Sequence, residues 1–199
     1  MAIRGVVDRI LEYPAVYATW QAPFASQKFA PAARHLRNRV VRRILDVGCG
    51  PGTNAARFLG AEYVGLDINP RYLSIARSRY PGRFVEADVE SADLSSLGTF
   101  DTILVNSFLH PVPDAAVERI LAQLGQRLTP DGRAHLLELV LPERLSPARM
   151  MARLDRGRHA RLLEDWRRLF ETHLETVSFE PYTYAGGLWS MIYFQGKAR

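Results

Sequence analysis

The chain has 199 residues, 47% of them hydrophobic, which is enough for one domain with a sizeable core. No apolar run approaches the roughly 20 residues that span a bilayer, and the first residues carry charges where a signal peptide needs an apolar segment, so we expect a cytoplasmic protein without a membrane span. A single cysteine excludes an internal disulfide framework, and a net charge of +5, carried mostly by arginine, suits either an anionic ligand or ordinary solvated surface.

Residues 1–40 have the pattern of short amphipathic helices, which prolines at positions 14, 23 and 31 break into pieces. Four aromatic side chains lie three to four residues apart, as on one helical face: Tyr13, Tyr17, Trp20 and Phe24. These side chains either pack the segment onto the core or cover a ligand, in which case Tyr17 and Trp20 contact the substrate. We therefore predict an N-terminal helical lid segment over residues 1–40, followed by the main domain over residues 41–199.

The most distinctive stretch joins the apolar strand Ile44–Val47 to the glycine loop Gly48–Gly52. Glycines let a backbone turn sharply and approach a ligand closely, and a following helix N-terminus favours a carboxylate or phosphate. Asp46 lies in this strand, and two further apolar runs end in an acid at intervals of twenty-one residues, Asp67 and Asp88. Since the carboxyl ends of parallel strands meet at one edge of a sheet, these acids predict a nucleoside-binding pocket.

Strand and helix patterns alternate through the rest of the chain. Helices are expected over Thr53–Leu59, from Asn69-Pro70 to about Tyr80, from a cap at Asp114 to about Leu128, and around Leu162–Phe170. Strands are expected at Tyr63–Asp67, Phe84–Asp88, Phe100–Asn106, Ala134–Leu141, Leu174–Phe179 and Leu188–Phe194. This alternation favours a mostly parallel sheet with helices on both faces.

Over residues 40–141 the chain resembles the class I S-adenosylmethionine-dependent methyltransferases of the small-molecule type. Five motifs carry the resemblance in the family's order and spacing: Asp46-Val47-Gly48-Cys49-Gly50-Pro51-Gly52, Val64-Gly65-Leu66-Asp67-Ile68, Ala87-Asp88-Val89, Phe100–Asn106 and Leu128-Thr129-Pro130-Asp131-Gly132. The resemblance implies an α/β fold with a Rossmann-like, doubly wound, seven-stranded sheet. That sheet is mostly parallel with an antiparallel C-terminal hairpin, and an N-terminal helical lid precedes it.

The resemblance also implies S-adenosylmethionine as the cofactor. The residues that it places at this cofactor are Asp46, Gly48, Cys49, Gly50, Asp67, Ile68, Asp88, Val89 and Asn106. Asp67 is expected to bind the ribose hydroxyls and Asp88 the adenine amine, with Ile68 and Val89 beside the ring. Asn106 is expected near the methionine amino group, which Asp46 helps to hold through water.

Two of these positions have alternative interpretations. Glu86 and Glu90 lie close enough to Asp88 in the sequence to take its place. Cys49 has the chemistry of a nucleophile, but no base partner is evident, and a small loop residue is the better interpretation.

His110, in the loop after the fourth strand, is the best candidate for a catalytic base. Its segment lies on the carboxyl side of the sheet, where the acceptor is expected, and an imidazole titrates close to neutral pH. The alternative is a structural histidine in a proline-rich loop. In the family, amino N-methyltransferases carry Asn/Asp-Pro-Pro-Tyr/Phe here, and the different residues at Asn106–Leu109 speak against a DNA base as the acceptor.

A helical cap insertion over about 143–172 is the second candidate for the acceptor side. Its basic residues could bind a phosphate or carboxylate, or form a solvated face: Arg156, Arg158, His159 and Arg161. The histidine spacing indicates no metal site.

The leading hypothesis is an S-adenosylmethionine-dependent methyltransferase for a small-molecule acceptor, anionic or lipid-like in character. Two alternatives stay open, a catalytically silent sensor or partner subunit that binds S-adenosylmethionine, and a nucleic-acid methyltransferase, which basic charge alone supports weakly. An NAD-dependent dehydrogenase is disfavoured, because Thr53 stands where the dinucleotide fingerprint needs glycine or alanine. The oligomeric state is left open.

Overall fold

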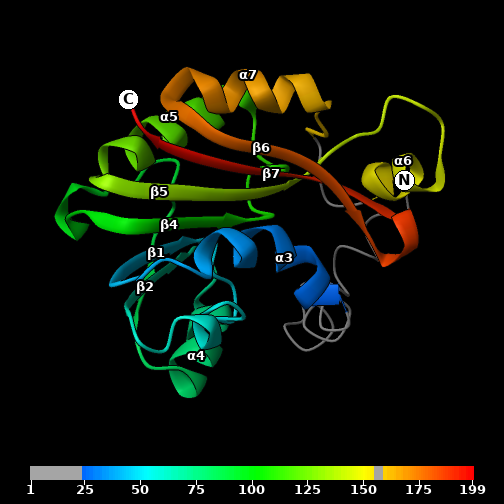
Figure 1. The fold of residues 1–199 in the computed structure, drawn as a ribbon. Coiled ribbons are helices and arrows are strands. Elements are labelled where there is room, and N and C mark those ends of the chain that lie inside the picture. Colours follow the sequence, from blue (N-terminus) through cyan, green and yellow to red (C-terminus); the bar gives the residue numbers. More distant parts are fainter. Residues whose placement is uncertain (1–23, 155–158) are drawn as a thin grey trace.

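Seven strands form one sheet, in the order β3-β2-β1-β4-β5-β7-β6, within the residues that the computed structural model describes, 24–154 and 159–199 (Figure 1). The strands are β1 (Arg43–Val47), β2 (Glu62–Asp67), β3 (Arg83–Glu86), β4 (Phe100–Asn106), β5 (Leu128–Leu139), β6 (Leu174–Tyr184) and β7 (Trp189–Ala198). The first five strands pair in parallel, and β7 lies antiparallel between β5 and β6. The expected Rossmann-like, seven-stranded sheet with an antiparallel C-terminal hairpin is confirmed.

Some of the expected site residues lie outside this description. They are Tyr17 and Trp20 in the expected lid, and Arg156 and Arg158 in the expected cap insertion.

Helices cover both faces of the sheet. They are α3 (Ala25–Leu36), α4 (Pro70–Arg79), α5 (Asp114–Gln126), α6 (Pro147–Leu154) and α7 (Leu163–His173). Figure 1 shows α5 and α7 on one face and α3 and α4 on the other. Alternate side chains of one strand enter different cores: Leu45 and Val47 pack on the α5 and α7 side, while Ile44 packs on the α3 and α4 side. Burial on both faces explains why β1 reads as a nearly continuous apolar run.

The start of α4 follows directly from its sequence. The side-chain oxygen of Asn69 accepts hydrogen bonds from the backbone N–H groups of Arg71 and Tyr72, at 3.0 and 3.4 Å. Pro70 occupies the first helical position, where its missing N–H has no partner to lose. The expected helix start is confirmed, and it fixes the segment that follows Asp67.

The prediction of a helix over Thr53–Leu59 is wrong. Only a 3-10 turn forms, at Ala55–Arg57, with bonds from Ala55 N to Gly52 O and from Phe58 N to Ala55 O. A segment this short gains little from helix formation, and the side chain of Asn54 is drawn inward to hydrogen-bond with Asp46.

Two further local expectations need correction. The side chain of Asp114 does not cap α5, because the N-cap position is Pro113 and the Asp114 carboxylate pairs with Arg161 instead. Pro31 does not break its helix but lies inside α3, where it is buried beside Phe29 and Ala32. Burial of this face offsets the single helical hydrogen bond that proline cannot make.

A chain excursion leaves the sheet after β5 and returns before α7. Val140 and Arg161 form an isolated parallel bridge at its two ends, and Leu141 N donates to Arg161 O at 2.7 Å. Inside the excursion, Ala152 of α6 packs with Met191 of β7.

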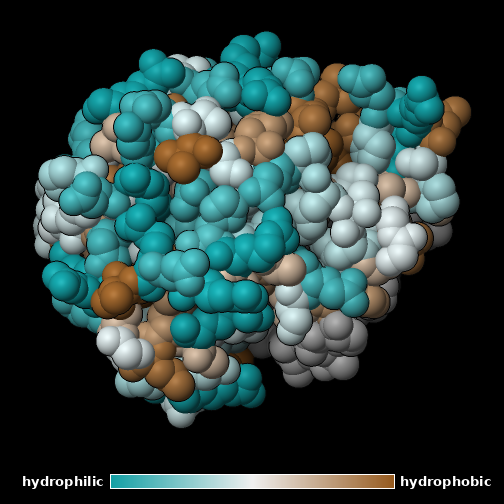
Figure 2. All heavy atoms as spheres, in the orientation of Figure 1, coloured by the Kyte–Doolittle hydropathy of each residue, from teal (hydrophilic) through white to brown (hydrophobic). Residues whose placement is uncertain are grey.

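Figure 2 shows the distribution of hydropathy on one face of the molecule. Hydrophilic residues dominate that face, and the hydrophobic ones form small groups. Among the described helices, none is both long and apolar enough to cross a membrane.

Candidate functional site

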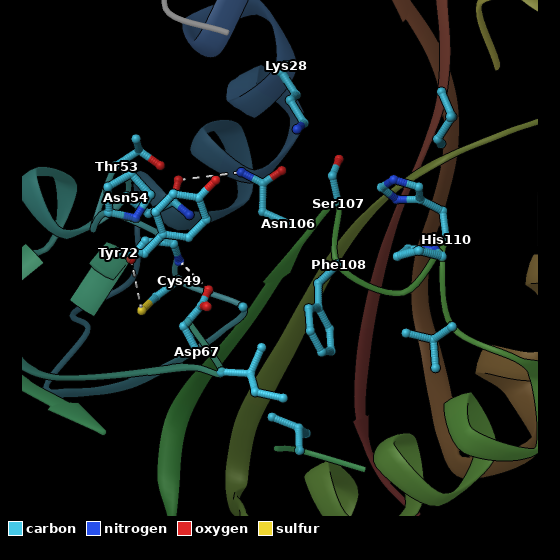
Figure 3. Close-up of a pocket in the computed structure, with 18 of the residues that line it drawn as sticks. Lys28, Cys49, Thr53, Asn54, Asp67, Tyr72, Asn106, Ser107, Phe108 and His110 are labelled. Carbon is cyan, nitrogen blue, oxygen red and sulfur yellow. Dashed lines mark hydrogen bonds between the residues drawn. The ribbon is translucent and has the colours of Figure 1, made fainter. Parts of the chain in front are cut away.

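A cavity of about 640 Å³ opens at the carboxyl ends of β1, β2 and β4. Ligands of open α/β sheets bind at this edge, where the strand order reverses. In Figure 3, Asp67 and Tyr72 lie on one side of the cavity and His110 on the other, with Asn106 and Ser107 between them.

The glycine loop forms the floor of the cavity. Gly48 has φ +69°, and a Cβ added there would lie 2.5 Å from the ring of Phe108. Only glycine therefore fits this position without displacing the aromatic side chain. The neighbouring Cys49 is 2% exposed, and burial raises the pKa of its thiol, so the side chain behaves as a small packing residue rather than as a nucleophile.

Asp67 braces the glycine loop from the end of β2. One carboxylate oxygen accepts a hydrogen bond from Gly50 N and the other from Asn69 N, both at 2.8 Å. Burial raises the pKa of Asp67, against the opposing effect of these amide donors. Each oxygen keeps a further lone pair, so the residue can accept two hydroxyl hydrogens at the cavity wall.

A buried chain of polar side chains connects Asp46 to the cavity. Asp46 accepts hydrogen bonds from Tyr63 Oη at 2.5 Å and from Asn54 Nδ2 at 3.2 Å. Asn106 Nδ2 in turn donates to Asn54 Oδ1 at 3.4 Å. Burial raises the pKa of Asp46 to about 7.

These hydrogen-bonded side chains present a hydrogen-bond acceptor atom to the cavity. The Oδ1 atoms of Asp46 and Asn106 are buried and have no hydrogen-bond partner among the described residues. Asn106 and Asn54 line the cavity, whereas Asp46 is fully buried behind them. A buried oxygen without a donor is costly, so the geometry suits a ligand that brings N–H groups to this point.

The remaining residues that were expected at the cofactor lie together in the cavity wall near β3. Ile68, Asp88 and Val89 all line the cavity. The Asp88 carboxylate accepts hydrogen bonds from Glu90 N and Ser91 Oγ, both at 3.0 Å. Of its two sequence alternatives, Glu90 also lines the cavity, while Glu86 is not among the lining residues.

The opposite end of the cavity is apolar, apart from one buried lysine. It is lined by Leu139, Tyr184, Trp189 and Met191, with the rings of Tyr184 and Trp189 stacked at 6.2 Å. Lys28 reaches this region from α3 and is 6% exposed (Figure 3). This combination suits an organic molecule with an apolar body and a negatively charged or hydrogen-bonding end.

His110 stands between the two ends of the cavity. Its side chain lines the cavity and is largely buried. The ring atom Nδ1 lies 3.0 Å from Oε2 of Glu138, a carboxylate on β5 that is fully buried. An imidazole held by a carboxylate at one nitrogen can exchange a proton at the other.

Of the four basic residues expected in the insertion, the structure describes His159 and Arg161. Arg161 is 4% exposed and is not among the residues that line the cavity. Its guanidinium pairs with Asp114 and lies over the ring of Trp166, 4.6 Å from the ring centroid. His159 does not line the cavity either, so neither residue is placed to contact a ligand there.

Several residues of this site were not predicted from the sequence, among them the polar residues Lys28, Asn54 and Glu138. Glu138 had a signal, because a lone carboxylate interrupts the apolar run of β5 and a buried charge needs partners. Lys28 and Asn54 had none, since each is an ordinary polar residue until the fold places it. Among the described residues, no three His, Cys, Asp or Glu side chains converge as a metal site.

A family model described as "Methyltransferase domain" matches residues 44–132. The matched stretch contains the glycine loop, Asp67, Asp88, Asn106 and His110, but not Glu138 or the C-terminal hairpin.

The chain is also similar to two groups of named relatives. It is 34% identical over 140 residues to a trans-aconitate 2-methyltransferase of Methylobacterium radiotolerans, covering 67% of this chain and 50% of that one. It is 30% identical over 154 residues to a ubiquinone biosynthesis O-methyltransferase of Nitrosococcus oceani, covering 74% and 63%. The chain thus spans about half the length of the first of these relatives.

A solved structure shares the fold. The N-methyltransferase NodS from Bradyrhizobium japonicum WM9, in complex with S-adenosyl-L-homocysteine, superposes with a TM-score of 0.70 at 15% identity, covering 87% of this chain and 86% of that one.

Proposed function

Because the chain belongs to the class I S-adenosylmethionine-dependent methyltransferases, we propose that it transfers a methyl group from S-adenosylmethionine to a small organic acceptor. The observation that carries the proposal is a single cavity, with the donor-side acids at one end and His110 beside an apolar end. The residues present suit this donor. Asp67 offers carboxylate oxygens for two hydroxyls, and the buried Asn106 Oδ1 needs an N–H donor such as an ammonium group.

We assign the donor contacts accordingly. Gly48, Cys49 and Gly50 lie along the methionine and ribose portion, and Asp67 accepts the ribose hydroxyls. Ile68 and Val89 flank the adenine, and Asp88 accepts its amine. Asn106 Oδ1 accepts from the methionine ammonium, and the buried carboxyl group of Asp46 supports that contact through Asn54. The residues that we assign to S-adenosylmethionine are thus Gly48, Cys49, Gly50, Asp67, Ile68, Asp88, Val89, Asn106 and Asp46.

The protein's own part in the reaction is alignment and proton removal. When bound, S-adenosylmethionine would supply a methyl group for in-line displacement at the methyl carbon, with the sulfur as leaving group. The cavity walls hold donor and acceptor together and exclude water from them. His110 takes the proton that an acceptor hydroxyl or amine loses as it is methylated.

We propose that the acceptor lies against Leu139, Trp189 and Met191, with a polar or anionic end toward Lys28. This placement agrees with the expectation of an anionic or lipid-like acceptor. Trans-aconitate, in the name of one relative, is such an anion.

We propose that two segments cover the acceptor. The first is residues 1–40, with Tyr17 and Trp20 in contact with it; α3 supports this part, because Ala25 and Lys28 belong to the cavity wall. The second is the part of the expected insertion that precedes α7, with Arg156 and Arg158 in contact with the acceptor. Cytoplasmic location also stays a prediction.

Calorimetric titration with S-adenosylmethionine and S-adenosyl-L-homocysteine, with NADH as control, tests the donor. We expect micromolar dissociation constants for the first two and no heat from NADH. Absence of binding by both would overturn the proposal.

Turnover is tested by release of S-adenosyl-L-homocysteine over a panel of acceptors, among them organic acids, phenols and amines. The variant His110→Ala should lose turnover and keep donor affinity, whereas His173→Ala, a histidine on α7 outside the cavity, should keep both. Donor binding without turnover on any acceptor would favour the silent sensor or partner subunit, and full activity of His110→Ala would make His110 structural.

A further inference from the structure

The loop that carries His110 is held by charged side chains from two distant parts of the chain. Glu138 of β5 accepts backbone hydrogen bonds from Phe108 and Leu109 through Oε1, at 2.9 and 2.8 Å. Its other oxygen, Oε2, accepts from His110 N at 3.2 Å and lies 3.0 Å from His110 Nδ1. One carboxylate thus fixes three consecutive residues of the loop and also one imidazole.

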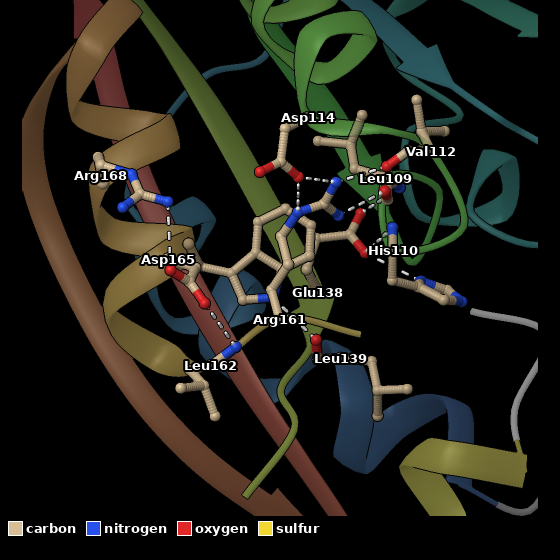
Figure 4. A network of polar contacts seen from close by, with 11 residues as sticks. Leu109, His110, Val112, Asp114, Glu138, Leu139, Arg161, Leu162, Asp165 and Arg168 are labelled. Carbon is tan, nitrogen blue, oxygen red and sulfur yellow. Dashed lines mark hydrogen bonds and ion pairs between the residues drawn. The ribbon is translucent and has the colours of Figure 1, made fainter. Parts of the chain in front are cut away.

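Arg161 holds the same loop through its carbonyl groups (Figure 4). Its guanidinium donates to Leu109 O at 3.1 Å and to Val112 O at 2.5 Å. The guanidinium is itself fixed, by the Asp114 carboxylate at 2.7 Å and by the ring of Trp166. The N–H groups of the loop therefore face an anion, and two of its carbonyl groups face a cation.

Burying the Glu138 carboxylate costs free energy that a purely structural role would not require. Glu138 is fully buried on the face of β5 that also presents Ala134 and Leu136 to the core. A buried carboxylate has a large desolvation cost, and a hydrophobic residue here would usually serve stability as well or better. Four hydrogen-bond contacts offset this cost, and all four are made to the His110 loop.

The contact at Nδ1 determines what His110 can do. A carboxylate accepts but cannot donate, so a neutral imidazole next to it carries its proton on Nδ1. The other ring nitrogen, Nε2, then has the lone pair that proton abstraction requires. Figure 3 shows the imidazole at the cavity, across from Asp67.

From these contacts we infer that Glu138 is a positioning residue for His110, with Arg161 as the second support of the loop. The inference rests on the proposed methyl transfer. As the acceptor's oxygen or nitrogen bonds to the methyl carbon, the S–CH₃ bond breaks and its electron pair stays on sulfur. The acceptor proton moves to Nε2, and Glu138 stabilises the imidazolium until that proton passes to solvent.

The variant Glu138→Gln tests the inference, because it keeps the side-chain shape and replaces one carboxylate oxygen by an NH2 group, which donates hydrogen bonds and cannot accept one from Nδ1–H. We expect kcat to fall at least tenfold with the dissociation constant for S-adenosylmethionine unchanged. In a His110→Ala background, Glu138→Gln should have almost no further effect on kcat.

Glu180→Gln is the matched control. Glu180 also pairs with a histidine, His35, at 2.6 Å, but neither residue lines the cavity. This variant should keep the wild-type kcat and the wild-type tautomer of His110.

The ¹⁵N chemical shifts of the His110 imidazole separate this inference from the proposed function, since they need no acceptor and no turnover. We expect the Nδ1–H tautomer in the wild type and its loss in Glu138→Gln. A wild-type tautomer in the variant, or a wild-type kcat, would overturn the positioning role. If Glu138→Gln does not fold, Glu138→Asp takes its place, because the shorter side chain withdraws the carboxylate from Nδ1. The ¹⁵N shifts of His110 are then measured in that variant and judged by the same criteria.

Discussion

At the scale of single residues, Asp67 is the contact on which donor binding should depend most. Its carboxylate already braces Gly50 and Asn69, and in our proposal it accepts two ribose hydroxyls. Asp67→Ala should weaken donor binding by about 1.5–3 kcal/mol, the range for hydrogen bonds to a charged group. Calorimetric titration measures the change, with Glu86→Ala, an exposed acid outside the cavity, as control. An unchanged dissociation constant would remove Asp67 from the ribose contact.

Asp46 should make stability depend on pH. Burial raises its pKa to about 7 in the folded protein, above about 3.9 in the unfolded chain. Its contribution to stability is therefore fully present below pH ~4 and is lost as pH rises through about 7. The free energy of unfolding should fall between pH 5 and pH 7, by up to about 1.4 kcal/mol per pH unit from this residue.

Urea denaturation of the wild type and Asp46→Asn at pH 5, 6, 7 and 8 measures this effect. Other titrating groups act in both proteins, so the difference between the two slopes isolates Asp46. Equal slopes would show that Asp46 is ionised in the folded protein throughout this range.

The sequence revealed the site residues that belong to local motifs. Asp67 and the glycine loop could be found because a strand end and a turn are short-range features with recognisable composition. Glu138 and His110 are twenty-eight residues apart, and only the parallel pairing of β4 with β5 brings them together. Arg161 was expected at the acceptor because it lies among other arginines, but the Asp114 carboxylate, two carbonyl groups and an aromatic ring determine its position.

At the scale of elements, the cap of α4 links helix stability to the donor site. Asn69→Ala removes the side-chain acceptor for Arg71 N and Tyr72 N and should lower the free energy of unfolding by about 1 kcal/mol, while Asn69→Ser should largely preserve it. The bond from the backbone of Asn69 to Asp67 persists in both variants, so donor affinity should change little. Urea denaturation and calorimetry measure the two effects. A loss of affinity as large as that of Asp67→Ala would mean that the cap also positions the carboxylate.

Strands were easier to predict than the short helical pieces. The predicted Phe100–Asn106 strand agrees with β4 at both ends, because burial on both faces gives a clear apolar run. Thr53–Leu59 has helical composition, but the side chain of Asn54 makes a tertiary hydrogen bond that no local pattern reveals. The C-terminal strands extend beyond their predicted ends because Pro181 and Tyr182 pair across the hairpin with β7.

At the scale of the whole molecule, one continuous sheet connects all the apolar clusters, so donor binding should stabilise the protein as a unit. At a free donor concentration of one hundred times the dissociation constant, the free energy of unfolding should rise by about 2.7 kcal/mol. For a domain of this size, that corresponds to an increase in Tm of roughly 5–11 °C. Scanning calorimetry should show one transition that moves with S-adenosyl-L-homocysteine and does not move with NADH. Two transitions, of which only one moves, would mean that the C-terminal hairpin unfolds separately.

The bridge between Val140 and Arg161 has a consequence for how this architecture can diversify. The bridge brings the two ends of the intervening excursion to adjacent positions, whatever the chain between them does. Replacing that stretch by one of twice its length would cost only about 0.6 kcal/mol in loop-closure entropy. The length and composition of the excursion can therefore be altered without changing the sheet or the donor site. In our proposal that the excursion covers the acceptor, such changes would alter the acceptor preference.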